Sequence, residues 1–397
     1  MPSSCVMTFN ENPDGVYFSG QKLSGRVFLV TDKVKIIRGI YIVIRGYADV
    51  HWSETRSSGA TRRVYFRAHD EYFTTRTQVM TVTSGNKFNL TPGKYEFDFE
   101  VHLPYVLPSS FLGRCGEIRY EVVLTIDRPW RFDNVFRQPF TVICPLDLNI
   151  HTKYRQPVDK TVKTRFTKVL CCGDGGEMIL TAHMPHSGFA PGQHIPIDVV
   201  IRNFSSTECS ELKLMLVRTV EYNSSTPHCR RKYDSVTLVD HRFGPIGKFR
   251  EKSLSCCLRI PSVPPTSFNT CKIIGLSYFV DFHLKTKGLH SNMNMRLPVV
   301  IGTVPLFYGG QLKPKINCQP SSSHSTSNGI YSIPAPPSYE EATRFDVDSN
   351  NDLDENQHLE PAPYVPKYPV YYEFDDMILC RKLCTSHHPF EETKQRY

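Results

Sequence analysis

Residues near the C-terminal end of the chain have types and spacing that suit peptide recognition. The stretch Pro336-Pro337-Ser338-Tyr339 places two prolines, which hold the backbone near polyproline II geometry, before an aromatic ring. Such a segment loses little further entropy when an aromatic-lined groove grips it, and the tyrosine can fill a second pocket. This is the PPxY pattern that WW domains bind. Pro336, Pro337 and Tyr339 are therefore the predicted WW-domain binding residues.

A degenerate copy of the same pattern follows at residues 361–368, which read Pro-Ala-Pro-Tyr-Val-Pro-Lys-Tyr. An alanine interrupts the proline pair of one candidate, and a valine replaces the first proline of the other. A weak secondary WW site here would use Pro363, Tyr364, Pro366 and Tyr368. The sequence leaves open whether this second site binds.

A third cluster, Cys380 and Cys384 followed by His387 and His388, offers ligand types that zinc accepts. A lone tail cluster lacks the surrounding groups that orient the ligands of a structural zinc site. We therefore assign no metal site and no cofactor. Acylation of the two cysteines and zinc binding by the cluster both stay open.

Patterns typical of enzymes are missing from the sequence. The glycine run at 173–176 lacks the lysine and the serine or threonine of a phosphate-binding loop, and a hairpin turn explains it better. No nucleophile elbow and no metalloprotease helix are found, and the fifteen histidines form no ordered constellation. We predict that the protein is not an enzyme.

The candidate motifs stand in a tail whose composition differs from the rest of the chain. Residues 311–334 are rich in serine, asparagine and proline, and residues 346–360 are acidic with few aliphatic side chains. Such segments bury too little apolar surface to offset their chain entropy. Residues 304–397 are therefore predicted to be a disordered tail.

Charge is unevenly distributed along the chain, whose formal net charge is +8. Residues 338–376 contain eleven acidic and two basic side chains, so the part before them is strongly basic. A basic folded surface without a nucleic-acid motif fits peripheral contact with an anionic membrane or with acidic protein segments. A merely soluble charged surface fits equally well. Nucleic acid is not an expected partner.

Localisation follows from what the sequence lacks. No run reaches the 18 or so apolar residues of a membrane-spanning helix, and the first residues do not read as a secretion signal. The thirteen cysteines are odd in number and scattered, which favours thiols over a disulfide framework. We expect a cytoplasmic protein.

The elements that must position these motifs are short strands. In residues 95–103 apolar and polar side chains alternate strictly, so the apolar ones share one face of a strand. Similar runs separated by turn residues recur at 25–30, 36–46 and 120–126, and few helical periods are found. Regular short strands that bury one face predict an all-β sandwich.

The strand pattern occurs twice. Residues 101–111 recur at 258–268 as a strand that ends in proline, a proline-rich turn and an aromatic residue. Residues 120–126 correspond to 278–284, and the stretch 17–29 is echoed at 189–201. Three matches in the same order indicate two copies of one fold. We predict sandwiches at residues 1–144 and 171–303, a basic interdomain linker at 145–170, and the tail at 304–397.

This organisation resembles that of the α-arrestins, the arrestin domain-containing proteins. The resemblance covers residues 7–303 and rests on Gly116 to Tyr120 leading to Asp127-Arg128-Pro129-Trp130, on the linker start at 145–149 and on the closing run 297–302. It implies two tandem arrestin-like, immunoglobulin-like β-sandwiches. The residues before a strand like 253–260 contain no cysteine, so the thioredoxin pairing of one family member is not expected here.

The resemblance also implies a function. A protein of this kind is a non-enzymatic adaptor that links membrane receptors or transporters to WW-domain HECT-type ubiquitin ligases and promotes ubiquitination, endocytosis and endosomal sorting. Such an adaptor would move from the cytoplasm to the plasma membrane and endosomes. The alternative is an arrestin-fold trafficking scaffold that acts without a ubiquitin ligase.

Overall fold

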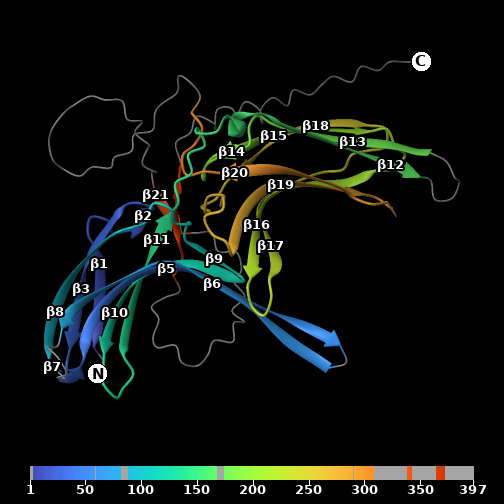
Figure 1. Ribbon diagram of the computed structural model, residues 1–397. Helices are drawn as coiled ribbons and strands as arrows, with labels where there is room; N and C mark the ends of the chain where they lie inside the picture. The colour runs from blue at the N-terminus through green and yellow to red at the C-terminus, as the bar shows by residue number, and fades with distance from the viewer. Residues whose placement is uncertain are drawn as a thin grey trace, which may run out of the picture.

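The computed structural model describes residues 3–58, 60–81, 88–167, 174–288, 290–307, 338–341 and 364–371. In this part of the chain the regular structure consists of strands and one 3-10 helix, η1 (Thr152–Arg155). Figure 1 shows two sheet-built bodies that meet near the middle of the molecule. The prediction of an all-β chain with two tandem sandwiches is confirmed.

The first sandwich is built from two main sheets whose apolar faces meet. One sheet has the order β1 (Ser4–Phe9), β3 (Lys22–Thr31), β8 (Gly93–His102). The other has the order β2 (Val16–Phe18), β11 (Asn134–Ile143), β10 (Gly116–Asp127), β5 (Gly39–Ser58), β6 (Ala60–Thr81), with β9 (Phe111–Gly113) beside β10. A small pair, β4 (Lys35–Ile37) and β7 (Phe88–Leu90), lies at the end of the sandwich. The alternation expected at 95–103 is seen in β8, whose polar residues are exposed between partly or fully buried apolar ones.

The second sandwich repeats the two main sheets, and its smaller sheet has one strand more than that of the first. Its sheets have the orders β12 (Val158–Thr167), β13 (Asp174–Met184), β15 (His194–Asn203), β18 (Glu251–Arg259) and β14 (Gly188–Phe189), β20 (Met293–Ile301), β19 (Ile274–Thr286), β16 (Cys209–Ser224), β17 (Arg230–Phe243). The added strand β12 lies within the predicted linker, which is a correction. Its apolar residues at 158, 162 and 166 turn inward while the basic residues between them stay exposed, as expected for an edge strand.

The internal repeat corresponds to the same hydrogen bonds in both sandwiches. The Tyr120 hydroxyl donates to the carbonyl of Pro108, and the Tyr278 hydroxyl donates to the carbonyl of Pro264, each at 2.7 Å. Both tyrosines are almost fully buried, so each phenol needs the partner that the proline-rich turn supplies. The repeat detected in the sequence is therefore a repeat of the buried hydrogen bonds.

A tight turn is also repeated. In the first sandwich the amide of Phe18 donates to the side chain of Gln21, and in the second that of Ala190 donates to Gln193, at 2.8 and 2.7 Å. The glycine before each glutamine has a positive φ, +84° at Gly20 and +92° at Gly192, which L side chains rarely adopt. We call these segments the first turn (residues 18–21) and the second turn (190–193).

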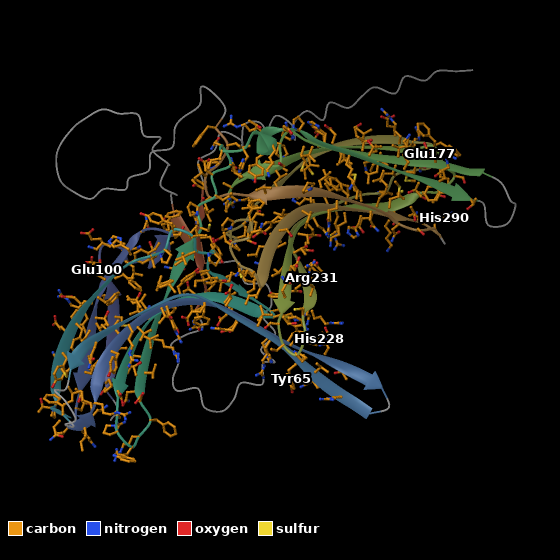
Figure 2. The ribbon with its side chains drawn as sticks, in the orientation of Figure 1. Tyr65, Glu100, Glu177, His228, Arg231 and His290 are labelled. Carbon is orange, nitrogen blue, oxygen red and sulfur yellow. The ribbon has the colours of Figure 1, made fainter. Side chains whose placement is uncertain are left out.

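The two sandwiches share a packed junction. The apolar core of the first includes Tyr222 and Ile274 from the second, and the backbone amide of Arg67 donates to Thr226 at 2.9 Å. Figure 2 shows Tyr65 and His228 where the β5–β6 hairpin passes the β16–β17 hairpin. An ion pair between Glu54 and Arg230 at 3.1 Å closes the same contact. The shared core and these bonds hold the sandwiches together.

Two short parts of the tail are strands, β21 (Ser338–Glu341) and β22 (Lys367–Val370). The prediction of disorder over 304–397 is corrected for them and for residues 304–307, which pair with residues 146–149. The rest of that prediction lies outside the described residues. Among the described cysteines, Cys257 is disulfide-bonded, whereas Cys5, Cys115, Cys144, Cys209, Cys229 and Cys271 are thiols. A search of the described residues for a helical membrane span finds none.

Candidate functional site at the tail and the sandwich junction

The structure describes part of each predicted binding site. Of the PPxY residues, Tyr339 lies in β21, and Pro336 and Pro337 lie outside the described residues. Of the degenerate copy, Tyr364, Pro366 and Tyr368 are described and Pro363 is not. The cysteines and histidines of the candidate zinc cluster also lie outside. The described tail residues come together, because β21 pairs with β22 where the two sandwiches meet (Figure 1).

Residues 364–371, which we call the anchor segment, bind the first sandwich through β11 and the turn before β9. The hydroxyl of Tyr364 lies 2.7 Å from Oγ1 of Thr141, and the same Oγ1 accepts the backbone N–H of Lys367 at 3.2 Å. The ammonium of Lys367 pairs with Asp14 at 3.1 Å. The hydroxyl of Tyr368 donates to the Ser110 carbonyl at 2.7 Å. Each anchor uses a fixed backbone or strand partner, so the segment has a defined register.

The end of the anchor segment binds the second sandwich. The backbone N–H of Tyr371 donates to the Pro191 carbonyl at 3.0 Å, and its hydroxyl donates to the Thr303 carbonyl. The second turn admits this close approach because Gly192 has no side chain. A Cβ on Gly192 would collide with the carbonyl oxygen of Tyr371. The anchor segment therefore bridges both sandwiches.

Burial controls the state of the tyrosines in the anchor segment. Loss of solvent raises the pKa of Tyr364 to about 12 and raises the pKa of Tyr368 and Tyr371 further above the ordinary value of 10. Tyr368 is only 1% exposed and its phenol lies close enough to Tyr278 and Arg218 of the second sandwich for their charges to act on it. A phenol is neutral near pH 7 already at its ordinary pKa, and burial extends this neutral range to higher pH for all three tyrosines.

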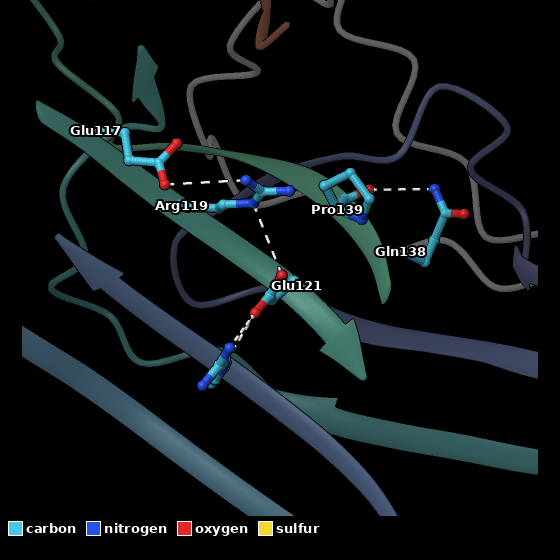
Figure 3. Close-up of polar contacts among 6 residues, drawn as sticks. Glu117, Arg119, Glu121, Gln138 and Pro139 are labelled. Carbon is cyan, nitrogen blue, oxygen red and sulfur yellow. Dashed lines mark hydrogen bonds and ion pairs between the residues drawn. The ribbon is translucent and has the colours of Figure 1, made fainter. Parts of the chain in front are cut away.

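A charged network lies on β10 and β5 beneath this region. Glu121, which is 0% exposed, accepts two hydrogen bonds from Arg45 at 2.8 and 2.5 Å, and Arg119 lies 3.7 Å from its other oxygen (Figure 3). Arg119 also faces Glu117 at 3.9 Å. The buried carboxylate is compensated by two cations, as a buried charge requires. The charges of Arg119 and Glu117 act on the phenol of Tyr364, so the network contributes to the electrostatic environment of the anchor segment.

The PPxY tyrosine lies on the outer edge of the anchor segment. In the antiparallel register Ser338 faces Val370, Tyr339 faces Pro369, and Glu341 faces Lys367. Tyr339 is partly buried and its charge reaches Tyr371. The main chain on both sides of this tyrosine is therefore engaged in a β-pair.

The arrangement supports binding of an extended peptide. In the described residues no three potential ligands gather in a way that could hold a metal ion. The residues that contact the anchor segment, Ser110, Thr141, Gly192 and Thr303, were not predicted from the sequence. A signal for the anchor segment existed, because residues 364–371 concentrate tyrosine, proline and valine in an otherwise polar tail. As WW-domain sites, Tyr339 and the degenerate copy stay predictions.

A second surface feature is the turn between β10 and β11, at the end of the first sandwich away from the junction (Figure 1). Trp130 and Phe132 at this turn are 92% and 90% exposed, and Arg128 and Arg131 flank them. Exposed aromatic rings beside arginines suit the polar and apolar layers of a membrane interface. We call residues 128–132 the aromatic tip.

Comparison with known proteins identifies the architecture. The family described as "Arrestin (or S-antigen), N-terminal domain" matches residues 5–149, and "Arrestin (or S-antigen), C-terminal domain" matches residues 174–306. The chain belongs to the arrestin family. Within that family it is an α-arrestin, because its curated relatives include several arrestin domain-containing proteins.

Three relatives illustrate the extent of the similarity. Arrestin domain-containing protein 17 of Caenorhabditis elegans is 29% identical over 74% of this chain and 69% of its own length. Arrestin domain-containing protein 4 of Homo sapiens is 28% identical over 91% of this chain and 85% of its own. Arrestin domain-containing protein 1 of Rattus norvegicus is 26% identical over 82% of this chain and 69% of its own length. The shared architecture is that of an arrestin-fold trafficking adaptor, a class that is generally not enzymatic.

Proposed function

We propose that this α-arrestin is a non-enzymatic adaptor that links membrane-protein cargo to WW-domain HECT-type ubiquitin ligases. The observation that carries the proposal is the PPxY motif around Tyr339 on the same chain as two sandwiches that share apolar packing. The motif offers a ligase a short handle, while strand edges and loops offer cargo a broad surface. Cargo ubiquitination, endocytosis and endosomal sorting would follow from bringing the two together.

Peripheral membrane contact belongs to the same proposal. The aromatic tip supports it, since Trp130 and Phe132 project into solvent and arginines lie beside them. Nearby Lys35 adds positive charge, close enough to Arg128 for the two cations to repel. An adaptor that rests this end on the cytoplasmic face of a plasma or endosomal membrane would meet receptors or transporters as cargo.

A pull-down tests the ligase link. The purified full-length chain is captured on an immobilised tandem WW module of a HECT-type ligase, whose second domain adds avidity where the degenerate copy also binds. Tyr339→Ala should abolish capture. Ser338→Ala is the matched control, since the motif accepts any residue at that position, and it should be captured like the wild type.

The opposite result decides against the proposal. Capture of Tyr339→Ala at the wild-type level would show that the motif does not recruit the ligase. If this variant also kept its cargo and its location in cells, the protein would be a trafficking scaffold that works without a ligase.

A further inference from the structure

We propose that the junction of the two sandwiches is a binding site for an extended tyrosine- and proline-containing peptide, and that its occupant is the chain's own anchor segment. Through β22 the bound segment holds β21 and withdraws the PPxY tyrosine from WW domains. The site is thus an intramolecular clasp on the ligase motif. This regulatory consequence rests on the function proposed above, whereas the binding site itself does not.

The contacts of the anchor segment are those of a seated peptide. Three tyrosines in eight residues bind fixed partners on three elements: Thr141 on β11, the Ser110 carbonyl, and the Thr303 carbonyl after β20. Tyr368, Val370 and Tyr371 are each at most 4% exposed. A segment lying loosely on the surface would not bury its apolar groups and pair its hydroxyls at the same time.

The main chain of the segment divides its hydrogen bonds between two sides. The N–H groups of Lys367 and Tyr371 donate to the sandwiches, and Pro369 between them has no N–H to donate. This leaves the other edge of β22 open for a partner strand. β21 occupies that edge over four residue pairs, which is a strand addition within one chain.

The clasp explains how a short strand pair can persist. An isolated two-stranded pair is marginal in water because it buries little apolar surface. Here both sandwiches hold β22 in place, so β21 pairs with an edge that is already formed. Only the conformational entropy of β21 itself is lost when the pair forms. If the anchor segment leaves the groove, the pair loses this template and Tyr339 is released.

The paired form of the motif and its ligase-bound form exclude each other. A WW domain requires the proline pair in a solvent-facing polyproline II shape and the tyrosine ring in a pocket. In the clasp the residues on both sides of Tyr339 pair with Pro369 and its neighbours, and the ring is partly covered. One WW domain and β22 cannot hold residues 338–341 at once.

The affinity of a single WW domain tests the regulation. It is measured by calorimetry for a peptide of residues 330–345, for the full chain, and for the full chain with Tyr368→Ala and Tyr371→Ala together. A clasp that is closed nine-tenths of the time weakens binding to the full chain ~10-fold relative to the peptide, and the double variant restores it. Tyr105→Ala, an exposed tyrosine near the first turn, is the matched control and should bind like the wild-type chain.

Equal affinities for peptide, full chain and double variant would overturn the clasp while leaving the proposed ligase link intact. The groove is tested without any WW domain by trypsin cleavage after Lys367. We expect this bond to resist cleavage in the wild type and in Tyr105→Ala, and to be cut rapidly in the double variant. Equally rapid cleavage in all three would overturn the binding site, whether or not the peptide binds a WW domain. Thermal melting of each chain confirms that the sandwiches are folded.

Discussion

The first and second turns are two copies of one device used in different ways. Both place a glycine with positive φ before a glutamine whose side chain accepts a backbone N–H. The first turn is covered by a side chain, since a Cβ on Gly20 would lie 2.7 Å from the ring of Tyr105. The second is covered by the main chain of Tyr371 from the tail. The two turns therefore share one backbone conformation, and the second turn binds the anchor segment.

The residues at equivalent positions near the two turns also differ in whether they contact the tail. By the spacing of the repeat, Asp14 in the first sandwich corresponds to His186 in the second. Asp14 pairs with Lys367 of the anchor segment, whereas His186 packs against Phe189 with the rings tilted and their centroids 4.2 Å apart. The first sandwich contributes charge to the tail contact, and the second contributes a close backbone approach. A one-sandwich protein could not provide both.

The largest effect should come from alanine at Gly192, with Gly20→Ala as the comparison. Gly20→Ala forces an L side chain into positive φ and costs roughly 1–2 kcal/mol of unfolding free energy, because the Tyr105 ring can move aside. Gly192→Ala carries the same strain and also drives the Tyr371 backbone away, so it should lose a further ~1–3 kcal/mol. Chemical denaturation of both variants measures the difference. Equal losses would contradict the idea that only the second turn seats the tail.

An intermediate effect is expected for His186 as the pH falls. Burial lowers the pKa of His186 from 6.5 to about 4, so below pH 6.5 the unfolded chain takes up a proton that the folded chain refuses. The stabilising effect of its neutral form is complete above pH 6.5 and is lost as the pH falls towards 4, up to ~3 kcal/mol. His186→Phe keeps a ring on Phe189 and removes the titration. Its stability, measured from pH 7 to pH 4, should fall less than that of the wild type; parallel curves would refute the assignment.

The smallest effect on stability should come from the aromatic tip. Trp130→Ser and Phe132→Ser remove rings that are almost fully exposed, so the unfolding free energy should change by less than ~0.5 kcal/mol. Binding to vesicles that contain phosphatidylserine should nevertheless fall strongly in a sedimentation assay. The corresponding turn of the second sandwich, between β19 and β20, provides the control through Lys287→Ser. Unchanged vesicle binding by the tip variants would remove the support for membrane contact.

Local patterns explain which features were predictable from the sequence. The alternation in β8 and the repeated proline-rich turns reflect which side chains are buried within one strand or one turn. Because these patterns are local and repeated, both sandwiches could be predicted from the sequence. Strand β12 was read as linker because only every fourth residue, at 158, 162 and 166, faces the core and the residues between are polar. Edge strands give such weak signals because most of their surface meets water.

The anchor segment could not be placed from its own letters. Tyr364 and Tyr368 were read as a damaged WW motif, and their burial depends on the Ser110 carbonyl and Thr141, more than 220 residues away in the chain. The contacts of the segment come from both sandwiches at once, which no local pattern encodes. The PPxY motif, in contrast, can be recognised from its four residues alone. Its pairing with β22 could be seen only in the structure.

Hydrogen exchange at residues 367–371 tests the central claim most directly. It is measured by mass spectrometry on the wild-type chain, Gly20→Ala and Gly192→Ala without any partner. The seated tail predicts slow exchange for the wild type and for Gly20→Ala, and fast exchange for Gly192→Ala, because only the second turn receives the Tyr371 backbone. Exchange at the rate of a free peptide in the wild-type chain would contradict the account.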